Sequence, residues 1–122
     1  MPIVDIERVL ADDGAPAPGL AQSLADALGR ALGSAPGRTW VRLRWLPAAD
    51  YAENDTPVDV GALPVFVTVL HAHPPEGTQL AAQVAALTAA VAAVLACDAA
   101  RVHVQMAPAG AGRQAFGGRL VP

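Results

Sequence analysis

The sequence has little cysteine and little charge, and both shortages limit what the protein can be. Its single cysteine, Cys97, cannot form a disulfide within the chain, so a reducing, cytoplasmic location is expected. Only 16% of the residues are charged and the net charge is −3, so the chain offers no broad basic surface for nucleic acid or anionic lipid. The chain does not open with a charged segment followed by an apolar core, and we therefore expect no signal peptide.

The longest stretch without a charge runs from Leu80 to Cys97 and has to be tested as a membrane span. Its larger apolar side chains recur at steps of three and four, at Leu80, Val84, Leu87, Val91 and Val94. The remaining positions are mostly alanine, which is weak material for a bilayer. We therefore expect a helix packed on a sheet and no membrane partner.

The order of the predicted elements indicates a single α/β domain over residues 1–122 that contains a tandem β-α-β repeat. A β-branched run from Met1 to Glu7, a leucine stripe from Leu20 to Leu32 and an alternating run from Thr39 to Leu46 predict strand, helix and strand. The plan recurs with a strand at 64–70, a helix started by 74–76 and a strand at 101–107.

The spacing of the prolines supports a duplication. Pro2 and Pro64, which open the two units, are 62 residues apart, and Pro47 and Pro108, which close them, are 61 apart. Pseudo-repeats 2–47 and 64–108 with right-handed crossovers predict a four-stranded mixed sheet with two helices on one face. The other face is then expected to stay open and apolar and to need a partner, so we expect an oligomer.

The last segment, residues 109–122, is rich in glycine and is predicted to form a hairpin. Phe116 stands beside the pair Gly117-Gly118, and paired glycines favour a tight turn. The hairpin therefore presents Phe116 to the core, to a neighbouring subunit or to a ligand.

Pro2 is the residue with the most distinctive chemistry. Removal of Met1 would leave Pro2 as a free secondary amine, whereas an internal proline nitrogen is an amide without basicity. Ordinary α-amino groups titrate at about 7.7–8. Burial and neighbouring cations lower the pKa of an amine toward the range of a general base. The structural alternative is that Pro2 merely begins a strand.

An initial Pro2 on a strand, two β-α-β units and a closing Phe-Gly-Gly-x-Leu together resemble the tautomerase superfamily. That group includes 4-oxalocrotonate tautomerase, 5-carboxymethyl-2-hydroxymuconate isomerase and macrophage migration inhibitory factor. The resemblance spans nearly the whole chain and implies a homotrimer with pockets between subunits. It also implies cofactor-independent proton transfer on a small carboxylated enol or keto acid.

The resemblance implies roles for individual residues. Pro2 matches the catalytic proline, Thr39-x-Val41-Arg42-Leu43 resembles the strand that supplies a substrate-binding arginine, and Phe116 matches an apolar wall of the pocket. The chain departs from the family at two places. Its segment from Ala11 to Asp13 lacks the arginine that follows the first strand, and Gln114 stands where many relatives have an aromatic residue.

Three other groups of side chains have two interpretations each. Arg42 and Arg44 lie on the same strand face, where they can bind a carboxylate or pair with the acidic connector 47–63. The spacing of His71 and His73 allows a metal site with His103, but no carboxylate completes it and we expect no metal. His73 can instead help to bind substrate.

These patterns predict a tautomerase or isomerase with Pro2 as general base and Arg42 as carboxylate ligand. Arg44, His73 and Phe116 complete the predicted substrate site. One alternative is a non-catalytic trimeric binding protein that keeps Met1. Another is a hydratase or dehalogenase of unsaturated acids that uses the same proline.

Overall fold

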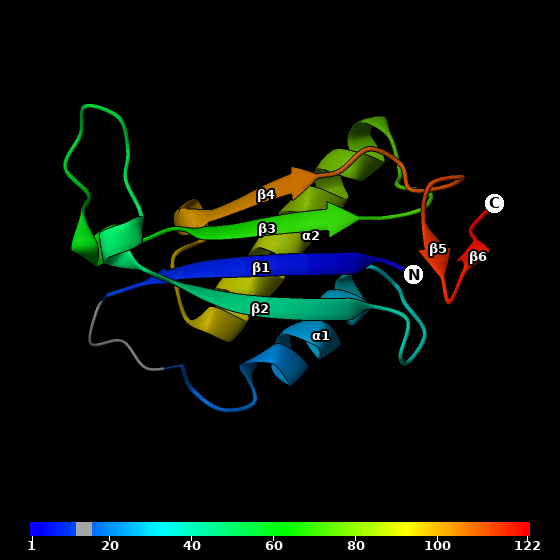
Figure 1. The fold of residues 1–122 in the computed structure, drawn as a ribbon, viewed down its shortest axis with the longest axis horizontal. Coiled ribbons are helices and arrows are strands. Elements are labelled where there is room, and N and C mark those ends of the chain that lie inside the picture. Colours follow the sequence, from blue (N-terminus) through cyan, green and yellow to red (C-terminus); the bar gives the residue numbers. More distant parts are fainter. Residues whose placement is uncertain (12–15) are drawn as a thin grey trace.

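The computed structural model describes residues 1–11 and 16–122, and in them two helices cover one face of a four-stranded sheet (Figure 1). The strands are β1 (Ile3–Leu10), β2 (Trp40–Pro47), β3 (Val65–Leu70) and β4 (Val102–Met106). The helices are α1 (Leu20–Ala31) and α2 (Gly77–Leu95). Short 3-10 turns lie at Ala48–Asp50, Val60–Ala62 and Ala99–Arg101. Asp12 and Asp13, which belong to the segment that lacks the family's arginine, lie outside the described residues.

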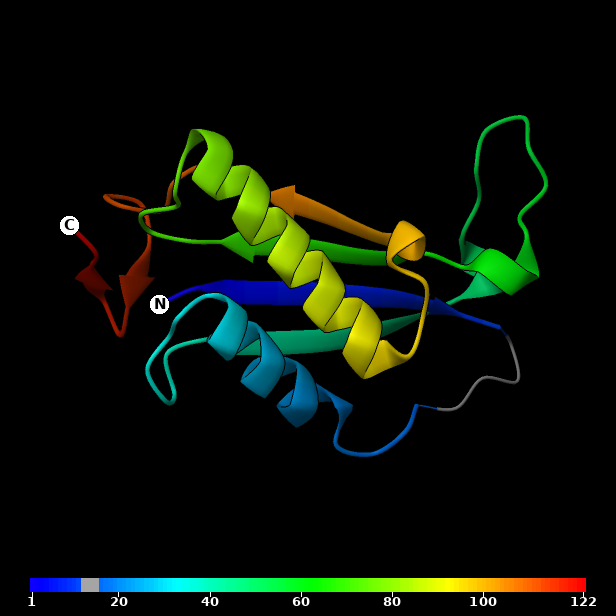
Figure 2. The ribbon, with the colours of Figure 1, turned by 180° about the vertical axis from the view of Figure 1, so that it is seen from behind.

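The sheet has the order β2-β1-β3-β4 and is mixed, as predicted. Each unit pairs its own strands in parallel, β1 with β2 and β3 with β4, while β1 and β3 are antiparallel at the centre. Both helices cross the same face of the sheet (Figure 2). The chain therefore folds as two β-α-β units joined edge to edge through their first strands.

The core lies between this face and the helices. The predicted helix stripes supply it, since Leu24 and Leu28 of α1 and Leu87 and Val91 of α2 are fully buried. The facing residues of the sheet are Val4, Ile6, Val65, Val67 and Val69. By length and composition alone α2 could cross a membrane, but here it packs on the sheet.

The sheet face without helices is open, but the expectation that it is apolar is wrong. The alternation of each strand puts the following side chains on it: Ile3, Asp5, Glu7, Trp40, Arg42, Arg44, Phe66, Thr68, Leu70, His103 and Gln105. Charged and amide groups alternate with apolar ones, so this face carries both ion-pairing and aromatic surface.

The strand register also corrects the match between Pro2 and Pro64. Ile3 lies on the open face, whereas Val65, 62 residues later, is buried in the core. An offset of 62 would therefore place equivalent residues on opposite faces, because side chains alternate along a strand. The true repeat offset is an odd number, so Pro64 is one residue out of step with Pro2.

The segment after β4 forms the predicted hairpin, with β5 (Ala115–Phe116) and β6 (Arg119–Leu120) joined by Gly117 and Gly118. Both glycines have positive φ, at 58° and 83°, which other residues rarely adopt. Figure 1 shows this hairpin beside the N-terminus at one end of the sheet. The two ends of the chain thus meet where β1 begins.

Candidate active site

The site is built around Pro2, which is buried at the start of β1. Its carbonyl oxygen accepts a hydrogen bond of 3.0 Å from the backbone N–H of Trp40 and so extends the β1–β2 pairing by one residue. On the other side, Ile3 pairs with Leu70, so the same register places His71 opposite Pro2. The backbone of Pro2 is therefore bonded to β2 on one side and lies beside the segment after β3 on the other.

Gln114, from the loop before β5, contacts the peptide bond that precedes Pro2. Its Nε2 donates to the carbonyl oxygen of Met1 over 3.3 Å. The Gln114 side chain is buried, with 6% of its surface exposed, and its Oε1 has no hydrogen-bond partner. A neutral amide therefore contacts the carbonyl group that is bonded to the nitrogen of Pro2.

Gly110 explains how this amide fits. A Cβ at Gly110 would lie 2.9 Å from Oε1 of Gln114 and 3.3 Å from Cδ1 of Leu70, so no larger residue fits without displacing the amide. The Gly110 N–H donates to the carbonyl of His71 over 2.9 Å, and the Gly110 carbonyl accepts from the N–H of Gln114 over 2.7 Å. The loop is thus tied to the segment that follows β3 and positions Gln114 with it.

Phe116 packs against Trp40 at the same end of the sheet. Their ring centroids are 5.1 Å apart and the rings are perpendicular, an edge-to-face arrangement. Phe116 is half-buried and Trp40 is 45% exposed, so the pair also faces outward. Since the N–H of Trp40 binds Pro2, the structure brings the predicted Phe116 close to the predicted base.

The histidines form a turn beside the N-terminus. The backbone N–H of His73 donates to Nδ1 of His71 over 3.1 Å, which assigns the proton of the neutral His71 ring to Nε2. Burial, the N-terminal ammonium and His73, in that order, lower the pKa of His71, so it is neutral at pH 7. His73 Nε2 lies 2.9 Å from the carbonyl oxygen of Pro122. No group of three metal-ligating side chains occurs among residues 1–11 and 16–122.

Arg42 and Arg44 lie on the open face, away from this cluster. Nε and Nη2 of Arg42 donate to Asp5 at 2.6 and 2.8 Å, a bidentate pair across β1 and β2. This contact raises the pKa of Arg42. Arg44 stands opposite Glu7 in the register. Within one chain, then, the partner of Arg42 is a strand carboxylate and not the acidic connector.

Arg38 is the arginine that reaches the N-terminus in the same chain. Its Nη1 lies 3.3 Å from the sulfur of Met1. Sequence reasoning did not single out Arg38, because the turn that positions it gives no regular pattern. Gln114 was noted only as a departure from the family, and His71 only as a possible metal ligand.

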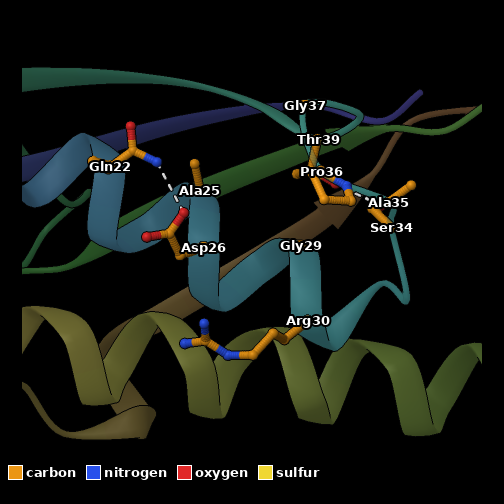
Figure 3. Close-up of a pocket in the computed structure, with 10 residues that line it drawn as sticks. All are labelled: Gln22, Ala25, Asp26, Gly29, Arg30, Ser34, Ala35, Pro36, Gly37 and Thr39. Carbon is orange, nitrogen blue, oxygen red and sulfur yellow. Dashed lines mark hydrogen bonds between the residues drawn. The ribbon is translucent and has the colours of Figure 1, made fainter.

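Two hollows differ in their relation to Pro2. The larger, of about 450 Å³, lies between α1 and residues 34–39 (Figure 3). There the Asp26 carboxylate already accepts a 2.8 Å hydrogen bond from Gln22. The smaller, of about 250 Å³, is lined by Leu70, Ala107, Pro108, Ala109, Gly110, Arg113 and Gln114. Neither hollow is lined by the predicted site residues, which are Pro2, Arg42, Arg44, His73 and Phe116. We take the smaller one as the site because it adjoins the contact between Gln114 and Met1.

Comparisons with known proteins bear on the fold. No protein-family model and no curated protein matches the sequence. Solved structures do match nearly its whole length. A fused 4-OT, described as a symmetric trimer, has a TM-score of 0.72 and 23% identity over 98% of this chain and 94% of that chain.

Two further structures match similarly well. Pt0534, inactivated by 2-oxo-3-pentynoate, has a TM-score of 0.75 and 18% identity, with 98% of this chain and 94% of that chain covered. Macrophage migration inhibitory factor from Oncomelania hupensis has a TM-score of 0.72 and 20% identity, with 99% and 82% covered. Together with the two β-α-β units, these matches show that the chain has the fold of the tautomerase superfamily.

Proposed function

We propose that the protein is a cofactor-independent tautomerase of small carboxylated enols or keto acids, with Pro2 as the general base. The observation that carries the proposal is the placement of Pro2, buried at the start of β1 between Trp40 and His71. A base needs a fixed position and little competing water, and this surrounding provides both.

The proposed reaction starts once Met1 has been removed. In ketonisation the neutral nitrogen of Pro2 takes the proton of the enol hydroxyl, and the resulting prolinium returns it to the α or γ carbon as the carbonyl forms. In the reverse direction Pro2 takes a proton from that carbon and the prolinium returns it to the carbonyl oxygen, so the amine is regenerated in both directions. The neutral His71 beside it adds no positive charge at pH 7.

Arginines are proposed to hold the carboxylate of the substrate. Arg42 offers a planar fork suited to a carboxylate, with Arg44 next to it on the same face. Because Arg42 lies on the open face, its substrate would be bound at the Pro2 of a neighbouring subunit. Arg38 is the candidate from the same chain, since it reaches the space that the Met1 side chain fills.

A homotrimer is proposed on the same grounds. Several matched structures are described as symmetric or asymmetric trimers, and the open face of this chain carries two exposed aromatic side chains, Trp40 and Phe66. Light scattering at micromolar concentration tests this proposal, and a monodisperse monomer would contradict it.

The first experiment follows the ketonisation of 2-hydroxymuconate and phenylenolpyruvate by mass-checked protein. Wild type without Met1 is expected to turn over at least one of them, and Pro2→Ala to lose about 10²–10⁴-fold in kcat/KM. Equal, feeble rates for wild type and Pro2→Ala would refute the proposal. Assays with unsaturated and halogenated acids, run in parallel, detect hydration or dehalogenation by the same proline.

The contacts of Met1 favour one alternative, a trimeric binding protein that retains this residue. Met1 is half-buried, its carbonyl binds Gln114 and its sulfur meets Arg38. With Met1 attached, the nitrogen of Pro2 is an amide and has no basicity. The intact mass of protein purified from its own host, compared with the full sequence, separates the two functions.

A further inference from the structure

Among residues 1–11 and 16–122, Gln114 is the buried polar side chain whose surroundings suggest a missing ligand. It is 94% buried (6% exposed), its Oε1 is unpaired, and its Nε2 is satisfied only by the carbonyl of Met1. Buried amides are normally hydrogen-bonded at both ends. Loss of Met1 would leave both ends of this amide without a partner in the chain.

The position of the Met1 carbonyl shows where a ligand atom would lie. That carbonyl carbon is bonded directly to the nitrogen of Pro2, so removal of Met1 frees the space on the side of the nitrogen where the amine carries its hydrogen and lone pair. The hydrogen bond from Gln114 to the carbonyl oxygen is therefore aimed at the space in front of the proposed base. Gly110 keeps the amide in this place, because any Cβ there would collide with Oε1.

The 250 Å³ cavity beside Gln114 indicates what the rest of the ligand looks like. Its wall is formed by Leu70, Ala107 and Pro108, which present hydrocarbon. Apolar cavities of about 150 Å³ already hold benzene, so this one has room for a phenyl or short alkyl group. A carboxylate against this hydrocarbon would lose its hydration, and among the lining residues only Arg113 carries a positive charge.

Resting on the proposed function, we propose that Gln114 donates a hydrogen bond to the keto or enol oxygen of the substrate. The apolar cavity next to it receives the substituent at the far end. The substrate class is then a 2-oxo acid or its enol with one carboxylate and an apolar substituent. Arg113 lines the mouth of the same cavity and is exposed, so a second carboxylate reaching Arg113 is the competing arrangement.

The test compares kcat/KM of Gln114→Leu and wild type on phenylenolpyruvate and on 2-hydroxymuconate. Gln83→Leu is the matched control, because Gln83 also has a buried, unpaired Oε1 but lies on α2. We expect wild type to prefer phenylenolpyruvate. Gln114→Leu should lose about 10²- to 10³-fold on it, the scale for removing one donor to a developing oxyanion, while Gln83→Leu stays within about twofold.

A second variant separates hydrogen bonding from a packing effect. The carboxylic acid of Gln114→Glu can donate as the amide does, whereas its ionised form repels an enolate. The ratio of Gln114→Glu to wild-type activity is therefore expected to fall as the pH rises through the pKa of the new carboxyl. A ratio that does not change with pH would contradict the proposed hydrogen bond.

The outcomes distinguish this inference from the proposed function. Pro2-dependent turnover that is unaffected by Gln114→Leu would overturn the role of Gln114 and leave the base in place. If wild type prefers 2-hydroxymuconate and Arg113→Gln loses that preference, Arg113 binds a second carboxylate and the proposed apolar subsite is wrong. Absence of Pro2-dependent turnover on every acid would overturn the proposed function and this inference with it.

Discussion

Replacing Arg42 by alanine separates its two possible roles, structural ion pair and carboxylate ligand. The pair with Asp5 is short, but the side chains are 61% and 32% exposed, so solvent screens it strongly. Exposed pairs contribute about 0.2–1 kcal/mol. For a domain of this size 1 kcal/mol corresponds to a shift of about 4 °C in Tm. Loss of the pair should therefore lower Tm by no more than about 4 °C.

Loss of a contact with substrate would instead lower kcat/KM, and by a larger free energy. Hydrogen bonds to a charged group contribute about 1.5–3 kcal/mol. Since each 1.36 kcal/mol is tenfold in rate, Arg42→Ala should lower kcat/KM by about 10- to 150-fold. Most of this loss should appear in KM, because a carboxylate that takes no part in the proton transfer is held equally in substrate and transition state.

Asp5→Asn is the matched control, since it removes the ion pair and leaves the guanidinium. We expect it to change Tm as much as Arg42→Ala does but kcat/KM by less than about threefold. The measurements are thermal unfolding at equal protomer concentration and steady-state kinetics. If Arg42→Ala and Asp5→Asn lower Tm equally and neither changes kcat/KM, Arg42 is a structural residue and the assignment is wrong.

Three further predictions concern stability. Leu87→Ala in the core should cost about 2–5 kcal/mol in the free energy of unfolding, and a cost below 1 kcal/mol in a urea titration would contradict the packing. Because the pKa of His71 is lowered in the folded state, folding is disfavoured as the pH falls below about 6.5. Between pH 7 and 5, the Tm of His71→Gln should therefore fall by less than the Tm of wild type. The Tm of His103→Gln, a change at an exposed histidine, should fall by as much as that of wild type. A double-mutant cycle between Trp40 and Phe116 should give about 0.5–1.5 kcal/mol, and zero coupling would rule out the edge-to-face contact.

The sequence predicts much of the fold because its periodicities are regular. The leucine steps of α1 and the alternation of β2 each match the buried and exposed faces that the structure shows. Boundaries were less predictable: β1 runs on to Leu10, since Pro47 and Val65 lie alongside its far end. α2 begins at Gly77, after the prolines that were expected to start it.

The site was predictable only in part, because its contacts join distant segments. Pro2 and Phe116 lie at the same end of the sheet for two reasons. The register of β1 with β2 sets Trp40 beside Pro2, and a hairpin 114 residues after Pro2 packs Phe116 on Trp40. No local pattern shows that Gln114 reaches Met1, because the contact needs the space left by Gly110. The alternative that Arg42 pairs with the connector is wrong because Asp5 lies directly opposite Arg42 in the strand register.

The composition makes a direct test of the base possible. The sequence contains eight arginines and no lysine, so the N-terminal amine is its only aliphatic amine. Acetylation followed by hydroxylamine, which removes acyl groups from Cys97 and Tyr51, would therefore modify Pro2 alone in protein without Met1. The acetylated nitrogen is an amide and cannot accept a proton.

The decisive measurement is kcat/KM as a function of the acetylated fraction, determined by intact mass on the same sample. If Pro2 is the base, activity should fall in proportion to that fraction, and fully acetylated protein should lose about 10²-fold or more. Activity that survives complete acetylation would show that the base lies elsewhere and would contradict the proposed mechanism.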